Sequence, residues 1–327
     1  MTPRRTRTSR AAALPAVAIA LAACAQRPVP EPLDPASFPR APADLGARAL
    51  AHVATVVGFG ERHPGSPGAR RQVEYIEREL RSYGLAVEVD RWVDPGEGIE
   101  FANVIGTLPG KSSERIVLGC HHDTKVCSGH PRQEHNFPFV GANDGGSGVG
   151  LLLALAQTLA TGPRPTATLQ FVFFDGEESL EFKWNLARAL FGSRRFVARE
   201  RAPGSGRHWR EPIRAMLLLD MVGARDLQLD DDANSTPALK GILRAAAHAT
   251  GNPHLALTEP NTVTDDHLPF LDAGIPAAVL IDLANNPQWH TPDDTLEHVA
   301  ADSLQRVGAI VLAALPEIER RFVKERR

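Results

Sequence analysis

The sequence predicts an α/β domain in which helices cover both faces of a central, mostly parallel mixed sheet, so that the domain is a three-layer sandwich. Short apolar runs recur along the chain, and the run at residues 169–174 is rich in Phe. A run this short and this apolar is typical of a strand that is buried on both faces. Polar residues follow several of these runs, and open α/β sheets bind ligands beyond the carboxyl ends of their strands. A functional site is therefore expected at that edge of the sheet.

The first part of the domain is expected to contain two helices followed by three strands. Glycines and prolines between residues 58 and 68 indicate a loop, and segments with helical spacing stand on both sides of it. Gly84 is a natural stop for the second helix, and the strand-like runs come after it. The expected helices are residues 43–57 and 69–83, and the expected strands are residues 86–92, 102–107 and 115–120.

The second part is expected to alternate strands with helices and to end in a long amphipathic helix. The apolar segment 149–160 follows a glycine-rich turn, and Asp144 in that turn is either a helix cap or a side chain that reaches inward to a ligand. The remaining expected elements are strands at residues 169–174, 214–219 and 277–282, a short helix after Phe270, and a final helix at residues 301–323.

Residues 1–23 are expected to be a lipoprotein signal peptide. Residues 1–10 are rich in arginine and contain no acid, and residues 11–23 are apolar but too short to cross a bilayer as a stable helix. The sequence Leu-Ala-Ala-Cys that ends at Cys24 resembles a bacterial lipobox, which implies lipid on Cys24; an ordinary signal peptide with an incidental cysteine is the alternative. We expect an exported lipoprotein on the periplasmic or cell-surface side of a membrane.

The rest of the chain is expected to be a short tether and one catalytic domain. Residues 24–43 are rich in Pro and Ala, as in flexible linkers, and residues 44–327 are enough for one large domain. The net charge of -3 and the scattered basic residues argue against a nucleic-acid partner. With three cysteines in all, a metal site must use His and carboxylates. Cys120 and Cys127 are either a disulfide or free thiols.

Imidazoles and carboxylates gather at the expected strand ends and in the loops beyond them. Glu177 and Glu178 are adjacent and point in different directions, so one can bind a cation while the other moves protons. In His121-x-Asp123, the carboxylate can fix the tautomer of an imidazole ligand. His with Asp and Glu, without cysteine, suits a catalytic zinc that keeps an open coordination position. The expected site residues are His121, Asp144, Glu177, Glu178, Asp220 and His290.

In this order, the residues resemble the glutaminyl cyclotransferases, a branch of the zinc aminopeptidase superfamily. The superfamily pattern is met by His121-x-Asp123, Gly141-Ala142-x-Asp144, Glu177-Glu178, Asp220 and His290. The resemblance implies the fold of the zinc-dependent exopeptidases. It also implies that a single zinc ion is held by Asp144, Glu178 and His290.

Other segments resemble the cyclotransferase branch in particular. They are Pro64-Gly65-Ser66-Pro67-Gly68 after Arg62, Lys125, Gly192-Ser193-Arg194, Asp265-Asp266-His267 and Trp289. The resemblance implies that Glu177 is the catalytic base, that Asp220 and Asp265 form an acidic pair beside it, and that Trp289, Trp184 and Lys125 belong to the substrate pocket. The segment 145–148 is closer to the peptidase version of that loop, and Val279 and Asn285 replace a histidine and a phenylalanine of the animal cyclotransferase pocket.

The predicted reaction is the cyclisation of an amino-terminal glutamine of a peptide or protein to pyroglutamate, with release of ammonia. The leading alternative is a zinc aminopeptidase that uses the same residues, with His121 and Asp220 completing a second zinc site. A non-catalytic surface lipoprotein that keeps the fold as a binding module is a third hypothesis, because fold alone does not certify activity.

Several other polar and aromatic residues are expected to have no part in the site. The acidic run at residues 230–232 is expected to lie in a solvated loop, and Trp92 and Trp209 are expected to serve packing. The histidines expected at the surface or at helix ends are His208, His248, His254 and His298.

Overall fold

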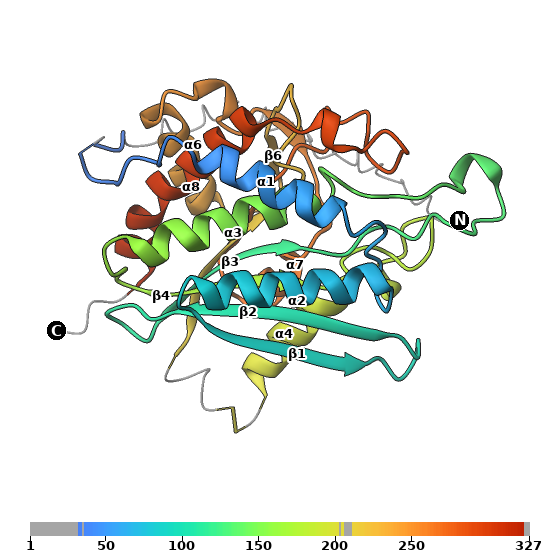
Figure 1. The fold of residues 1–327 in the computed structure, drawn as a ribbon. Coiled ribbons are helices and arrows are strands. Elements are labelled where there is room, and N and C mark those ends of the chain that lie inside the picture. The colour runs from blue at the N-terminus through green and yellow to red at the C-terminus, as the bar shows by residue number, and fades with distance from the viewer. Residues whose placement is uncertain (1–31, 35, 203, 206–210, 324–327) are drawn as a thin grey trace, which may run out of the picture.

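A sheet of six strands lies between two layers of helices in the computed structural model, which describes residues 32–34, 36–202, 204–205 and 211–323 (Figure 1). The strands of this sheet are Ala86–Val93 (β1), Glu100–Leu108 (β2), Arg115–His121 (β3), Thr168–Phe174 (β4), Ile213–Leu219 (β5) and Ala277–Leu280 (β8). Their order across the sheet is β1-β2-β4-β3-β5-β8. β1 pairs antiparallel with β2, and β2 with β4, whereas the remaining pairs are parallel. The predicted mixed, mostly parallel sheet is confirmed.

Helices cover both faces of the sheet, as the apolar strands require. One face carries Leu45–Val57 (α1), Pro67–Ser82 (α2), Gly146–Thr161 (α3), Pro237–Ala249 (α6) and Ala301–Phe322 (α8), and the other carries Phe191–Arg201 (α4) and Leu268–Asp272 (α7) (Figure 1). Single turns of 3-10 helix occupy Gln133–His135 (η1), Leu186–Arg188 (η2), Pro253–Leu255 (η3) and Leu296–His298 (η4). The three-layer arrangement is the one that the sequence predicts.

The packing of β4 explains why its sequence is apolar at nearly every position. Leu169, Phe171 and Phe173 pack into the core beneath α1, α2, α3 and α8, whereas Val172 and Phe174 pack into the smaller core beneath α4 and α7. Successive side chains of a strand point to opposite faces, so a strand with helices on both sides must be apolar at nearly every position.

The acidic run at residues 230–232 is a correction to the sequence analysis. Asp230–Asp232 forms a short strand (β6) that pairs parallel with Glu259–Asn261 (β7), and its three carboxylates are buried. They are satisfied by donors that come from other segments: Asp231 accepts from Lys240 at 2.9 Å, and Asp230 accepts from the Asn261 amide at 2.6 Å. A short acidic run can therefore be interior when the fold brings donors to it.

Cys120 and Cys127 are both buried free thiols, which settles the two alternatives in favour of no disulfide. Trp92 stacks on Phe101 with ring centroids 5.4 Å apart, in agreement with a packing role. No helix in the described residues is long and apolar enough to cross a bilayer. The expected signal peptide with Cys24 lies outside the described residues, as do His208 and Trp209.

Candidate active site

Side chains that the sequence singled out meet beyond the carboxyl ends of the parallel strands. They come from the end of β3, the loop after β4, the end of β5, the turn before α3 and the loop after β8, and they are His121, Glu177, Glu178, Asp220, Asp144 and His290. All of them except His121 line one cavity of about 240 Å³. The site thus lies at the sheet edge where the sequence places it.

Asp144, Glu178 and His290 form one group that fits a metal ion. His290 Nε2 lies 2.9 Å from Glu178 Oε1 and 3.3 Å from Asp144 Oδ2. Burial lowers the pKa of His290, but the facing carboxylates of Glu178 and Asp144 outweigh burial and raise it to about 10. Asp144 Oδ2 and Glu178 Oε2 are buried, and each lies at ion-pair distance from one cationic side chain, His290 at 3.3 Å and Lys125 at 3.4 Å. Two carboxylates and one imidazole that converge in this way are the donor set of a catalytic zinc.

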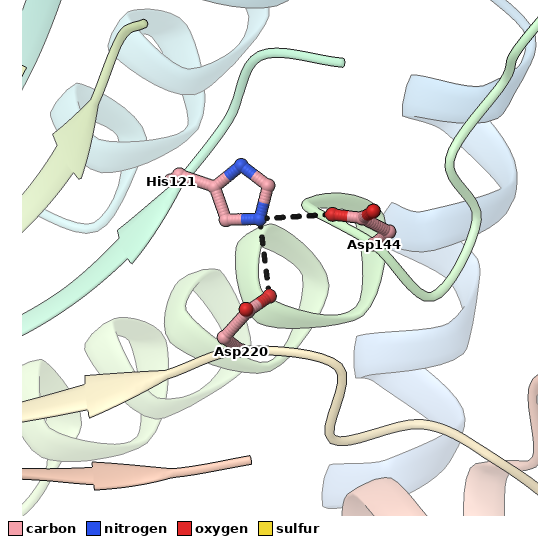
Figure 2. A group of neighbouring side chains, drawn as sticks. All are labelled: His121, Asp144 and Asp220. Atoms are coloured by element: carbon pink, nitrogen blue, oxygen red, sulfur yellow. Dashed lines mark hydrogen bonds and ion pairs between the residues drawn. The ribbon is translucent and has the colours of Figure 1, made fainter. Parts of the chain in front are cut away.

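A second group shares Asp144 with the first (Figure 2). His121 Nε2 lies 3.0 Å from Asp220 Oδ1 and 3.2 Å from Asp144 Oδ1, and the three side chains are buried. Asp144 therefore presents one oxygen to each group. Burial lowers the pKa of His121, but the Asp220, Asp123 and Asp144 carboxylates raise it well above the usual value.

Asp123 supports both the first histidine and the glutamate pair. Its Oδ1 lies 3.5 Å from His121 Nδ1, which suits the tautomer-fixing role that the sequence suggests. In addition, its two oxygens accept the backbone N–H groups of Glu177 and Glu178, both at 3.1 Å. One buried carboxylate thus links the end of β3 to the loop after β4.

Asp294 is a site residue that the sequence analysis missed. Its two oxygens accept the backbone N–H groups of Asn143 at 2.7 Å and Asp144 at 3.0 Å. Burial, and then the charge of Asp144, raise the pKa of Asp294 to about 7. Since Asp294 lies four residues after His290, it holds the segments of two metal-ligand candidates together. Its position in the sequence, next to the exposed Asp293, carries no sign of this role.

The backbone is strained beside two of these side chains. His290 has φ 54° and Met221, which follows Asp220, has φ 45°. The left-handed region costs residues with a Cβ of order 1–3 kcal/mol and persists where the surroundings impose it. Turn hydrogen bonds from Trp289 N to Asn286 O and from Thr291 N to Gln288 O hold the loop around His290. Such strain is a recurrent property of functional sites.

Glu177 is buried in an acidic environment that it shares with Asp220 and Asp265. Burial raises the pKa of Glu177 well above the usual value, and the charge of Asp265 raises it further. Burial also raises the pKa of Asp265, with the charge of Asp220 adding to the effect. Carboxyl groups tuned upward in a cavity are suited to general acid–base work near neutral pH.

The predicted pocket residues separate into two kinds. Trp184 and Trp289 line the cavity and are 38% and 43% exposed, so they stand at its mouth. Lys125, expected in the pocket, is instead fully buried: its Nζ donates to Ser179 O at 2.9 Å and lies 3.4 Å from Glu178 Oε2. Lys125 is not among the residues that line the cavity. It contacts Glu178 from the protein interior.

A sequence profile of peptidase family M28 matches residues 103–315, which include every metal-ligand candidate. The chain belongs to peptidase family M28. Members of this family are zinc-dependent, in agreement with the donor set described above. The M28 match covers the sheet from β2 onward and most of α8.

Among curated relatives is the glutaminyl-peptide cyclotransferase-like protein of Bos taurus. This chain is 32% identical to it, over 77% of this chain and 71% of that protein. It is 29% identical to the glutaminyl-peptide cyclotransferase of the same species, over 77% and 76% of the two chains. The resemblance to the glutaminyl cyclotransferases that the sequence motifs indicate is confirmed.

Solved structures agree with this placement within M28. The glutaminyl cyclase of an Acidobacteriales bacterium superposes with a TM-score of 0.76 at 33% identity, over 86% of this chain and 99% of that one. A leucine aminopeptidase precursor from Bacteroides thetaiotaomicron superposes with a TM-score of 0.74 at 25% identity, over 86% and 98% of the two chains. The fold is thus shared by proteins named for both activities.

Proposed function

We propose that the protein is a zinc-dependent glutaminyl-peptide cyclotransferase, which converts the amino-terminal glutamine of peptides and proteins to pyroglutamate and releases ammonia. The observation that carries this function is the placement of Glu177, Asp220 and Asp265 on the wall of the same small cavity as the metal ligands. Three carboxyl groups there suit a substrate that presents a free α-amine. The cyclotransferase names of the relatives support the same activity.

Asp144, Glu178 and His290 would hold one zinc ion, since their donor atoms converge and lie within 4.8 Å of one another. When bound there, zinc polarises the side-chain amide carbonyl of the glutamine and stabilises negative charge on its oxygen. Asp294 and Asp123 keep the ligand segments in place through backbone N–H groups.

Glu177 moves the proton. The neutral α-amine attacks the amide carbon of its own side chain, a new C–N bond forms, and the Glu177 carboxylate accepts one proton from the attacking nitrogen. Glu177 then delivers that proton to the departing amide nitrogen, the old C–N bond breaks, and ammonia leaves. The step is unimolecular in the bound substrate, so holding the glutamine in a curled conformation is a large part of catalysis.

Asp220 and Asp265 orient the α-amine, and the tryptophans enclose the glutamine. The two carboxyl groups stand beside Glu177 and are sensitive to each other's charge. Trp184 and Trp289 close the cavity at its mouth. Exclusion of water by these rings favours attack by the amine over hydrolysis.

A second candidate function is a two-zinc aminopeptidase, and one observation favours it. His121, Asp144 and Asp220 form a complete second donor set beside the first (Figure 2). In that case Glu177 would activate water, and the second zinc would occupy this group. Cyclotransferase activity remains the proposal for two reasons. Asp265 places a third buried carboxyl group beside Glu177 and Asp220, and the curated relatives carry the cyclotransferase name.

One incubation separates the two functions. The zinc-loaded protein, without its expected signal peptide, is mixed with a peptide that begins with glutamine and a peptide that begins with leucine. Both peptides are followed by mass spectrometry. Loss of ammonia from the first peptide, with the second intact, is the expected result. Release of leucine without cyclisation would overturn the proposal and assign His121 and Asp220 to a second zinc.

We also propose that the protein is exported and held by lipid on Cys24, because residues 1–23 have the composition of a lipoprotein signal peptide and end at a lipobox-like sequence. Labelling of cells with a radioactive fatty acid tests this. The label is expected on the full-length chain and should be lost in Cys24→Ala; equal labelling of both chains would contradict the anchor.

A further inference from the structure

A groove that is separate from the catalytic cavity lies beside the segment through which the chain enters the domain. Its volume is about 630 Å³, and residues 36–42, before α1, form one of its walls. The end of α3, the loop 162–166 and the second half of α8 form the remainder. These segments lie at the left of the view in Figure 1. We call this cavity the tether groove.

The tether groove is at the opposite end of the domain from the candidate active site. α3 begins beside Asp144 and ends at Thr161, which lines the groove. A helix of 16 residues is about 24 Å long, and this length separates the two sites. The loop 162–166 likewise precedes the amino end of β4, whereas Glu177 and Glu178 follow its carboxyl end. A partner in the groove therefore leaves the catalytic cavity open.

The floor of the tether groove is apolar. Phe38 and Leu159 line it together with Leu312 and Leu315, and prolines from three segments complete the surface. Phe38 and Leu159 are only half-buried, although both pack against the larger apolar core. An apolar surface with a polar rim marks a site that binds a protein, a membrane or another ligand.

Basic side chains surround this apolar floor. Arg40 and Arg164 line the groove and are exposed. The exposed Lys111 is next to them, since its backbone N–H donates to Pro165 O at 2.9 Å. Glu319 is the acidic residue among the described residues that line the groove, and its carboxylate already accepts a backbone N–H at 2.8 Å. The cations outnumber the carboxylate, so the rim favours an anionic partner.

The expected lipid on Cys24 would keep the tether groove close to a membrane. Cys24 lies twelve residues before Ala36, which is at the edge of the groove. A chain of that length spans at most about 43 Å. Tethering at this distance gives the groove a high effective concentration at the bilayer surface, where weak contacts are enough for docking.

We propose that the tether groove docks on the surface of an anionic phospholipid bilayer. The headgroup phosphates pair with Arg40, Arg164 and Lys111, and part of an acyl chain enters the apolar floor. The catalytic cavity then faces away from the membrane and is open to the amino termini of peptides. This inference goes beyond the proposed function, and it rests on the proposed lipid on Cys24 only for the choice of a bilayer as the partner.

The first test measures binding to vesicles that contain phosphatidylglycerol. The protein lacks its expected signal peptide and carries Cys24→Ala, so that no lipid is attached. The double variant Arg40→Glu, Arg164→Glu is expected to lower the partition coefficient at least about tenfold, because basic residues near an anionic surface each add to membrane binding. The control is Arg70→Glu with Arg132→Glu, which reverses two exposed arginines at the active-site end and should bind nearly like the unmodified protein.

A second measurement shows which end of the domain meets the bilayer. Cys120 and Cys127 are fully buried, so an environment-sensitive fluorophore can be attached selectively to a new surface cysteine. Thr161→Cys places it in the tether groove, and Ser128→Cys places it in the exposed loop after β3. Emission from the first position is expected to shift to shorter wavelength when vesicles are added, and emission from the second should not change.

The outcomes separate this inference from the proposed function. Equal vesicle binding by the two double variants, or a spectral shift at Ser128→Cys alone, would overturn docking through the groove. Absence of binding to anionic vesicles by the unmodified protein would overturn the inference without bearing on cyclisation. Arg40→Glu, Arg164→Glu is expected to cyclise a Gln-initiated peptide at the unmodified rate, which excludes loss of folding as the cause of weaker binding.

Discussion

Asp294 positions a metal-ligand candidate, Asp144, through the main chain. It accepts two consecutive N–H groups from Asn143 and Asp144, which fixes the turn that aims the Asp144 carboxylate at both donor groups. Arg62, fully buried, donates to the carbonyls of Val140 and Gly141 at 2.5 and 2.9 Å and fixes the same turn from the other side. The geometry of Asp144, which belongs to both donor groups, is therefore set by two residues that do not line the cavity.

Asp294→Asn is expected to weaken zinc binding by roughly 10–100-fold, because an amide can accept from only one of the two N–H groups and turns its NH2 toward the other. Competition with a chromophoric chelator measures the affinity. Asp293→Asn, at the exposed neighbouring position, is the matched control and should bind zinc like the unmodified protein. Equal affinities in the two variants would contradict the positioning role of Asp294.

Which site residues could be predicted follows from how each one acts. Asp144, Glu178 and His290 lie beyond strands or in a glycine-rich turn and belong to residue types with recognised metal chemistry, so the sequence indicates them as candidates. Asp294 accepts hydrogen bonds from a backbone segment that is far away in the sequence. Lys125 supports Glu178 and does not line the pocket, because the fold places Glu178, in the loop after β4, next to its ammonium group. Such roles depend on contacts between distant segments, for which a single sequence holds no signal.

At the scale of elements, β6 connects the acidic wall of the cavity to the sheet. Asp232, at its end, accepts from Val263 N at 2.9 Å and Ser235 N at 2.7 Å, and lies 3.2 Å from His267 Nε2. The Ser235 hydroxyl in turn accepts from Val279 N of β8 at 3.1 Å. The loop that carries Asp265 therefore depends on a carboxylate in a strand that the sequence analysis placed in a solvated loop.

Asp232→Asn is expected to lower the free energy of unfolding at pH 7 by about 2–3 kcal/mol, since it leaves buried donors poorly matched. Burial raises the pKa of Asp232, but hydrogen bonds from His267, Val263 and Ser235 outweigh burial and leave it well below the usual value. A depressed pKa contributes stability that is present above the unfolded pKa, about 4, and is lost as the pH falls through the folded pKa.

The difference in the free energy of unfolding between Asp232→Asn and the unmodified protein should therefore be largest at pH 7 and should decrease below about pH 4. Urea unfolding at both pH values measures it. Asp272→Asn, at an exposed position at the end of α7, controls for the loss of one charge and should change stability by less than about 0.5 kcal/mol. A difference that stays constant with pH would contradict the account of Asp232.

The strands of the main sheet were predicted more accurately than the helices and strands between β5 and β8. The strands of the main sheet lie within two residues of the predicted bounds at each end. The inner strands β3, β4 and β5 are apolar at most positions because helices cover both of their faces. The sequence analysis did not predict α4, which is rich in Arg, the 13-residue helix α6, or the β6–β7 pair. Asp230–Asp232 is entirely acidic and β7 contains Pro260, and only donors brought by the tertiary fold make these segments part of the interior.

At the scale of the whole molecule, the metal site sits beside two apolar cores that do not depend on it. The larger core joins α1, α2, α3, α6 and α8 to one face of the sheet, and the smaller core joins α4 and α7 to the other. The ligands stand at the strand ends, outside both clusters. The fold is thus expected to persist without zinc.

Removal of zinc with a chelator is expected to abolish cyclisation and to leave the far-ultraviolet circular dichroism nearly unchanged. With free zinc at 100 times the dissociation constant, binding contributes about 2.7 kcal/mol. This corresponds to a fall in Tm of roughly 5 °C for a domain of this size. Calorimetry with and without zinc measures the shift, and calcium at the same concentration is the control. Loss of helical signal on chelation would contradict the independence of the two cores.

Residues 126–139 are anchored at both ends and contact the candidate active site. Lys125 anchors the chain before it, and Arg62 grips the carbonyls of Val140 and Gly141 just after it. Between these anchors, Phe139 is fully buried and packs edge-to-face against the His290 ring, with the ring centroids 5.9 Å apart. A protein engineer who grafts a new loop at this edge of the active site should therefore replace the mostly exposed residues 128–136 and keep Phe139.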